Sequence, residues 1–200
     1  MKILLTRHGQ TEYNALGLVQ GQKNVPLNET GREQARNLAD QLNPYHIVKI
    51  FASPLARAKQ TADIIHETLG LDEKIPLIVD PALMERDFKP FEGKALKELS
   101  GSEIAFLRQI DETAMPGVEP LPSFKRRVLD FFERIQANEA LSLEEEDCLL
   151  VVTHAGVLRV VFSSILNMPV KNRSRNCLIH EISVNKYGFK LVESKGDGSC

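Results

Sequence analysis

Short, almost wholly apolar runs alternate along the chain with longer segments in which apolar side chains recur every three or four residues. The short runs, Ile3 to Thr6, Val48 to Ala52 and Leu149 to Thr153, are typical of strands covered on both faces. The longer segments predict helices with one buried face. These faces comprise Ala35, Leu38, Ala39 and Leu42, then Leu55, Ala58, Ala62, Ile65 and Leu69, and finally Phe124, Val128, Phe131, Phe132 and Ile135.

This alternation predicts an α/β fold, a three-layer α/β/α sandwich around a mostly parallel central sheet. Cys177 to Val184 and Phe189 to Val192 flank a turn and predict a closing hairpin, which gives the sheet an antiparallel edge strand. The pair Ser53-Pro54 predicts a helix start, because the hydroxyl can cap and proline fits the first helical position. We expect a single domain over residues 1–193 and a flexible tail over residues 194–200.

Composition narrows the class of protein. A length of 200 residues suits one compact domain, and a net charge of −2 gives no general attraction to nucleic acid or to an anionic membrane. No apolar run approaches the roughly 18 residues of a membrane span, and the start of the chain turns polar too soon for a signal peptide. The cysteines, Cys148, Cys177 and Cys200, are odd in number and widely spaced, which argues against disulfides or a zinc site and favours the cytoplasm.

Two predicted strands end in a similar way. Thr6-Arg7-His8-Gly9 follows the first strand, and Thr153-His154-Ala155-Gly156 ends the third. The second strand leads into a predicted helix that carries Arg57 in its first turn. Ligands of open α/β sheets bind beyond the carboxyl ends of the strands, so these side chains are expected to converge there.

Two histidines and two arginines at one rim suggest a phosphate site. Arginine offers a fork of donors that matches phosphate oxygens, and a neutral imidazole can attack phosphorus. Glu85 is the best candidate to protonate the leaving alkoxide, since repulsion from a phosphate favours a protonated carboxyl. From these residues alone, a phosphate site and a pair of structural histidines stay equally open. A structural role is what we expect for His46, His66 and His180.

At this point the motifs become specific. Residues 5–14, Leu-Thr-Arg-His-Gly-Gln-Thr-Glu-Tyr-Asn, resemble the signature of the histidine phosphatase superfamily, which is also called phosphoglycerate mutase-like. The similarity runs in family order over nearly the whole chain. It continues through Gln20-Gly21, Pro26 to Gly31, Ser53 to Ala62, Leu83 to Arg86, Phe91-Glu92-Gly93 and Thr153 to Val157.

The resemblance implies a role for each matching residue. His8 would be phosphorylated transiently, with Arg7, Arg57 and His154 completing the phosphate pocket and Glu85 donating the proton. Asn14, Gln20, Gly21 and Ala155 would contact the substrate. The family needs no metal and no cofactor, so the expected partner is a small phosphorylated molecule. The resemblance does not indicate an oligomeric state.

Residues 83–96 look closest to the TIGAR-like, fructose-2,6-bisphosphatase-type branch, which implies a sugar phosphate or bisphosphate as substrate. Lys89, Val118 and Pro120 depart from the family pattern and leave substrate identity open; Lys89 either contacts a second phosphate or faces solvent. A phosphoglycerate mutase is an alternative, although mutases of the superfamily carry a larger insertion between the two residues matching Glu85 and His154. A phosphoprotein phosphatase and a non-catalytic phospho-ligand module are further alternatives.

Overall fold

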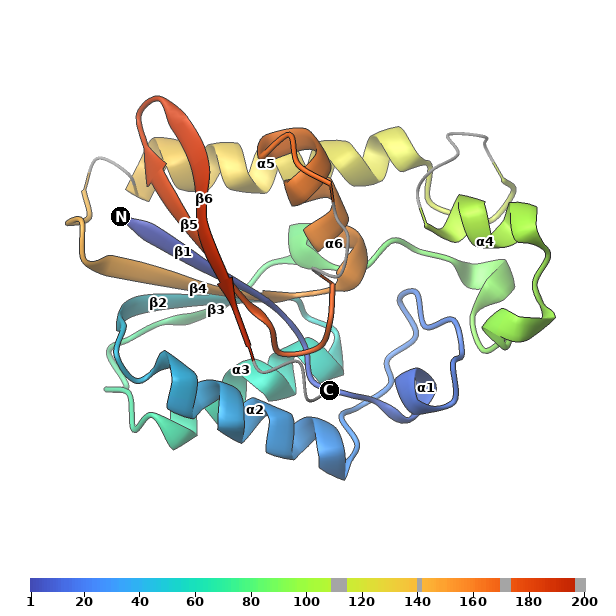
Figure 1. Cartoon of the computed structure of the whole chain (residues 1–200), viewed down its shortest axis with the longest axis horizontal. Coiled ribbons are helices and arrows are strands. Elements are labelled where there is room, and N and C mark those ends of the chain that lie inside the picture. Colours follow the sequence, from blue (N-terminus) through green and yellow to red (C-terminus); the bar gives the residue numbers. More distant parts are fainter. Residues whose placement is uncertain (109–114, 140–141, 170–173, 197–200) are drawn as a thin grey trace.

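The computed structural model describes residues 1–108, 115–139, 142–169 and 174–196, and within them a single mixed sheet lies between two layers of helices (Figure 1). The strand order across this sheet is β3-β2-β4-β1-β5-β6. The strands are β1 (Lys2–Arg7), β2 (His46–Ala52), β3 (Leu77–Val79), β4 (Asp147–Thr153), β5 (Ile179–Asn185) and β6 (Gly188–Lys195).

The pairing confirms the predicted fold class and refines its edge. Strands β3, β2, β4 and β1 are parallel, whereas β5 runs antiparallel to both of its neighbours, β1 and β6. The reversed strand therefore lies one position in from the edge, because β6 folds back on it as the predicted hairpin. Arg7 pairs with Thr153 across β1 and β4, so the next residues, His8 and His154, leave the sheet side by side.

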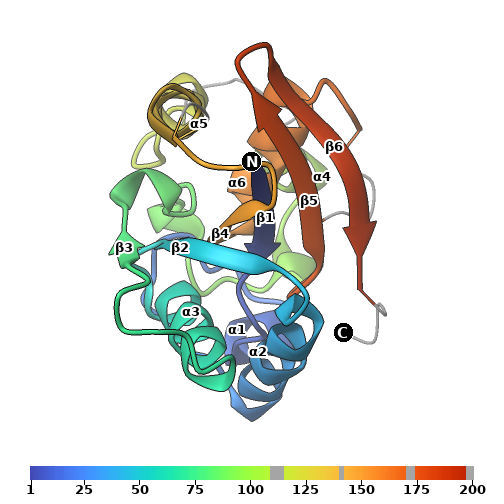
Figure 2. The same cartoon turned by 90° about the vertical axis from the view of Figure 1, so that its left-hand side faces the viewer.

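Each face of the sheet is covered by a helical pair, as the edge-on view in Figure 2 shows. Helices α2 (Glu29–Leu42) and α3 (Ala56–Thr68) pack on one face, where Leu4, Leu150 and Val152 point. Helices α5 (Leu121–Glu139) and α6 (Ala155–Val160) cover the other face, and a π-helical turn, Val161–Ile165, continues α6. No helix in the described ranges is both long and apolar enough to cross a bilayer.

The remaining segments form a cap, residues 11–22 and 88–108, over the carboxyl ends of the parallel strands, on the right of Figure 1. The cap contains α1 (Glu12–Ala15) and α4 (Gly101–Leu107), with short 3-10 turns at Lys89–Phe91 and Leu96–Glu98. A further 3-10 turn, Pro81–Leu83, precedes it. The cap has its own small core, separate from those of the sheet, made of Val19, Phe88, Phe91, Phe106 and Leu107 together with Val118.

Two local predictions are wrong. Helix α3 begins at Ala56 rather than at Pro54, and Leu55 takes the cap position without a side-chain bond; the Ser53 hydroxyl accepts from Leu55 N–H at 3.3 Å and also lies 2.7 Å from His154 Nε2. The predicted tail also starts too early. Ser194 and Lys195 belong to β6 and pair with β5, where Ser194 Oγ lies 2.9 Å from His180 Nδ1, and residues 197–200 lie outside the described ranges.

Candidate active site

His8 follows β1 directly and is only 2% exposed. Its Nδ1 lies 2.7 Å from the Gly9 carbonyl oxygen, which can only accept, so this nitrogen carries the proton. Arg57 Nε donates to the other ring nitrogen, Nε2, at 3.2 Å. The His8 carbonyl in turn accepts from Asn176 Nδ2 at 2.6 Å. The backbone thus fixes the tautomer and leaves the Nε2 lone pair directed at Arg57.

Electrostatics keep this imidazole neutral. Burial lowers the pKa of His8 well below its usual value, and the nearby guanidinium groups of Arg57 and Arg7 lower it further. A protonated imidazole has no lone pair on Nε2 and could not attack phosphorus. At neutral pH His8 therefore holds the form that a nucleophile requires.

His154 lies beside His8, with ring centroids 5.1 Å apart. Its Nε2 is 2.7 Å from Ser53 Oγ, whereas its buried Nδ1 has no hydrogen-bond partner in the described part of the chain. Burial, followed by the charge of Arg57, lowers the pKa of His154 well below the usual value as well. An incoming ligand could therefore engage His8 at Nε2, by replacing its contact with Arg57 Nε.

Arg7 and Arg57 supply the positive charge. Arg7 Nη1 donates to the Ser174 carbonyl at 2.8 Å, but its buried Nε has no partner among the described residues. Arg57 is held by the carbonyl oxygens of Lys23 at 2.9 Å and Gly21 at 2.8 Å. Burial lowers the pKa of both arginines to about 10, so both stay charged at neutral pH. Buried donors without partners are costly, and an oxyanion would satisfy them.

The Glu85 carboxyl group is fixed by two backbone donors. Arg86 N–H donates to Oε1 at 2.9 Å, and Gly156 N–H donates to Oε2 at 3.0 Å. Glu85 thereby joins the loop after β3 to the start of α6, two residues after His154. A carboxyl group that lines the same cavity as His8 can, in its protonated form, give a proton to a leaving group.

A network that the sequence did not reveal holds the Glu85 backbone. Arg127, on α5, donates to the carbonyls of Ala82 and Met84 at 2.8 and 2.7 Å, and to that of Glu85 at 3.0 Å. Its remaining donors bind both carboxylate oxygens of Glu119 at 2.8 and 2.9 Å. An arginine within an amphipathic helix gives no signal of this role, because its acceptors are backbone oxygens 42 or more positions away.

Two glycines of the motifs are required, Gly9 by space and Gly21 by its backbone conformation. A Cβ on Gly9 would lie 2.3 Å from the Gly31 carbonyl oxygen, so glycine lets the His8 loop rest against the start of α2. Gly21 has a φ of +52°, and a Cβ there would lie 2.2 Å from Glu92 Oε1. Both close approaches are to the protein itself, and they place the backbone around His8 and Arg57.

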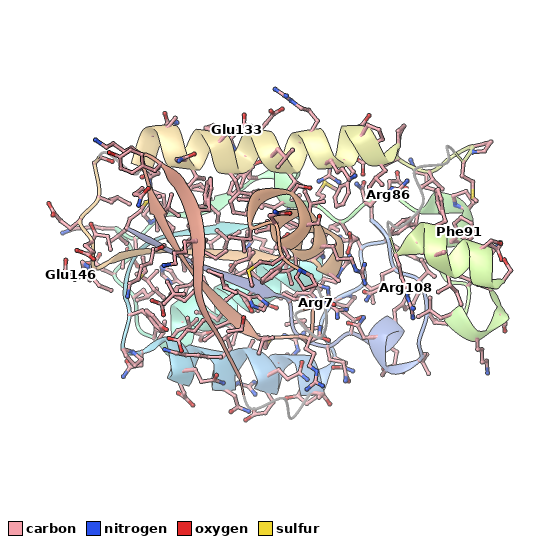
Figure 3. All side chains as sticks on the ribbon, turned by 45° about the horizontal axis from the view of Figure 1, so that its top comes forward. Arg7, Arg86, Phe91, Arg108, Glu133 and Glu146 are labelled. Atoms are coloured by element: carbon pink, nitrogen blue, oxygen red, sulfur yellow. The ribbon has the colours of Figure 1, made fainter. Side chains whose placement is uncertain are left out.

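These side chains surround one cavity of about 310 Å³ under the cap. Arg7 lines it from the end of β1 and Arg108 from the end of α4, which Figure 3 shows on the side where the cap meets the sheet. His154, whose ring centroid is 5.1 Å from that of His8, is not among the lining residues. The predicted residues among the lining are Arg7, His8, Asn14, Gln20, Gly21, Arg57 and Glu85.

Other predicted residues lie elsewhere. Ala155 begins α6 and is not part of the lining. Lys89 is also outside the cavity; its exposed ammonium lies 3.0 Å from Asp87, so the idea that it contacts a second phosphate is not supported. Sequence reasoning missed Arg108 and Arg159, which do line the cavity but stand in no recognisable motif. Within the described ranges, no group of three His, Cys, Asp or Glu side chains is placed to hold a metal ion.

Comparison with known proteins decides the family. The sequence profile of the histidine phosphatase superfamily (branch 1) matches residues 3–195. The chain belongs to this superfamily. A relative from Enterobacter sp. (strain 638), named "Probable phosphoglycerate mutase GpmB", is 32% identical over 209 residues, covering 98% of this chain and 93% of the relative.

Solved structures similar to this histidine phosphatase superfamily member agree on the fold. A candidate α-ribazole-5′-P phosphatase from Escherichia coli K-12 superposes with a TM-score of 0.79 at 26% identity, covering 98% of this chain and 97% of that one. A phosphoglycerate mutase from Thermus thermophilus gives a TM-score of 0.71 at 26% identity, covering 98% and 99%. The names span hydrolysis and phosphoryl transfer, so the superfamily fixes the fold and leaves the substrate open.

Proposed function

We propose that this chain is a metal-independent, cytoplasmic phosphatase that hydrolyses a small phosphomonoester through a phosphohistidine at His8. The observation that carries the proposal is the state of His8 itself. It is neutral and buried, its Nδ1 is fixed by the Gly9 carbonyl, and its Nε2 lone pair faces the charged Arg57. Arg7, whose buried Nε meets no partner within the described ranges, completes a pocket for the phosphate oxygens.

The reaction follows from this arrangement in two steps. His8 Nε2 bonds to phosphorus while the ester P–O bond breaks, and Glu85 gives its proton to the departing alkoxide. The Gly9 carbonyl accepts from Nδ1–H and so stabilises the positive charge on the ring, while Arg7 and Arg57 stabilise the transferring oxygens. Water then attacks phosphorus, returns a proton to Glu85 and displaces His8, which releases inorganic phosphate.

The test is to trap the intermediate. After rapid quenching during turnover of a ³²P-labelled ester, we expect an acid-labile, base-stable label on the peptide containing His8, and no label in His8→Ala. His154→Ala is the matched control, since it removes the neighbouring imidazole and keeps the nucleophile; it should still be labelled, although more slowly. Turnover by His8→Ala, or a label on another residue, would rule out the assignment.

The resemblance of residues 83–96 to the fructose-2,6-bisphosphatase-type branch makes a sugar phosphate or bisphosphate the first substrate class to test. The names of the relatives do not single out that branch. Release of phosphate from fructose 2,6-bisphosphate, α-ribazole 5′-phosphate and bisphosphoglycerate should be measured side by side. A kcat/KM that is highest for the sugar bisphosphate would support the branch assignment.

A mutase is the second candidate, because relatives covering nearly the whole chain bear that name. A mutase must return the phosphoryl group to its substrate before water reaches it. Assays of isomerisation and phosphate release, both with 3-phosphoglycerate, separate the two. Isomerisation faster than release would favour the mutase and overturn the phosphatase proposal.

A further inference from the structure

The cavity has two chemically different parts. Its floor is polar and is formed by Arg7, His8, Arg57 and Glu85. Its walls, which come from the cap, are apolar and would surround whatever alcohol is esterified to the phosphate. These wall side chains are Leu18, Val19, Phe88, Leu96, Ile104 and Leu107.

Some of these side chains are not simply the core of the cap. Val19, Phe88 and Leu107 belong to that core, whereas Leu18, Leu96 and Ile104 lie over it and remain partly open to solvent. Leu96 is 44% exposed, although its backbone is fixed by a bond from its N–H to the Gly17 carbonyl at 2.9 Å. Apolar side chains held open in a concave site are a usual feature of a surface that contacts an apolar ligand.

The polar side chains around the walls are poorly suited to a sugar. Each sugar hydroxyl must donate a hydrogen bond as well as accept one. The lining holds few side-chain oxygens, and each already accepts one hydrogen bond: Asn14 Oδ1 accepts from Thr11 N–H at 3.3 Å, and Gln20 Oε1 accepts from the Thr11 hydroxyl at 2.9 Å. Both Glu85 oxygens accept backbone N–H groups. Arg108 and Arg159 can only donate.

From this division we infer that the site takes phosphate esters of apolar or aromatic alcohols in preference to those of polyols. A buried hydroxyl without an acceptor is penalised, whereas an apolar group of the same shape gains by leaving water. The inference rests on the proposed phosphatase activity and narrows its substrate class away from sugar phosphates.

A matched pair of substrates tests it. Cyclohexylmethyl phosphate and glucose 6-phosphate both carry a six-membered ring on a primary alkoxide, so they differ mainly in the ring oxygen and hydroxyls. We expect kcat/KM to be at least about tenfold higher for cyclohexylmethyl phosphate, the range that apolar contacts in a pocket provide. Equal values, or a preference for the sugar, would overturn the inference.

Two leucine variants locate the preference. Leu96→Gln adds a hydrogen-bonding group to the wall at a partly exposed position that the fold tolerates. It should reduce the ratio of kcat/KM for cyclohexylmethyl phosphate to that for glucose 6-phosphate several-fold. Leu16→Gln is the control, because Leu16 is 60% exposed and does not line the cavity. If Leu96→Gln leaves the ratio unchanged, the cap does not select the alcohol and the inference fails. Phosphohistidine trapping distinguishes this failure from a failure of the proposed phosphatase function. If both substrates are hydrolysed equally well through His8, only the inferred substrate class is contradicted.

Discussion

Arg127 offers the sharpest test of how the fold positions Glu85, the proposed proton donor. All its guanidinium N–H groups are used: they bind the carbonyls of Ala82, Met84 and Glu85 and both carboxylate oxygens of Glu119. In Arg127→Lys the charge remains, but three donors at one point cannot span acceptors on both sides of a planar fork. The carbonyl of Glu85 then loses one of its two donors and keeps the bond from Gln22 Nε2 at 2.9 Å, so the backbone that carries the carboxyl group is held less tightly.

The loss of those contacts sets the expected effect of Arg127→Lys on rate and stability. A displacement of about 1 Å at a catalytic group costs on the order of 10²-fold in rate. This loss should appear with a primary alkyl phosphate, whose alkoxide needs a proton, and be much smaller with p-nitrophenyl phosphate. Breaking hydrogen bonds to a charged group that is only 22% exposed should also lower the free energy of unfolding by about 2 kcal/mol.

The assay is kcat for both esters, together with urea unfolding. Arg126→Lys is the matched control: Arg126 is the adjacent residue, is 73% exposed and pairs with Asp130 away from the cavity, so neither rate nor stability should change appreciably. Equal rate losses on both esters in Arg127→Lys would mean that Arg127 supports the fold in general and does not position Glu85. An unchanged alkyl phosphate rate would refute the reasoning outright.

Three further predictions concern the site. Glu85→Gln should slow alkyl phosphates far more than p-nitrophenyl phosphate, because an activated leaving group hardly needs the proton, and equal losses would count against the acid role. The lowered pKa values of buried His8 and His154 mean that the unfolded chain binds more protons below pH 6.5. Stability in urea should therefore fall as pH drops below that value, by about 1.4 kcal/mol per unit for each histidine. The slope should lessen in His8→Asn. EDTA should leave activity unchanged, and inactivation reversed by a divalent ion would contradict the metal-free scheme.

The sequence predicted most of the fold because its strands and helices bury strong apolar patterns. Leu4, Leu150 and Val152 are fully buried, as expected of strands covered on both faces. The site was predictable for a related reason, since strand ends in such sheets meet at one edge. The predictions that were wrong depended on contacts between residues far apart in the sequence. Ser53 resembles a helix cap in sequence, and only the fold shows that its hydroxyl meets His154.

The lining of the cavity by the cap was likewise not predictable from the sequence pattern. Leu96 lies in a 3-10 turn and Ile104 in the short helix α4, and their spacing says nothing about a shared cavity. Arg127 binds backbone carbonyls, which carry no side-chain signature in the sequence. The tail prediction failed because Ser194 and Lys195 are polar, whereas an edge strand needs only its backbone to pair. The apolar wall of the cavity and the hydrogen bonds of Arg127 thus become visible only in the folded chain.

The pairing of Arg7 with Thr153 has a consequence for how this enzyme can be studied. Sliding β1 by one residue along β4 would turn Leu4 and Leu5 to the wrong layers and would carry His8 away from its neighbour at the same time. A chain in which β1 pairs in the shifted register would therefore lose both core packing and turnover. Specific activity measured during refolding then reports the fraction of molecules in which β1 and β4 pair in the native register. Its rise with time gives the rate at which the sheet forms.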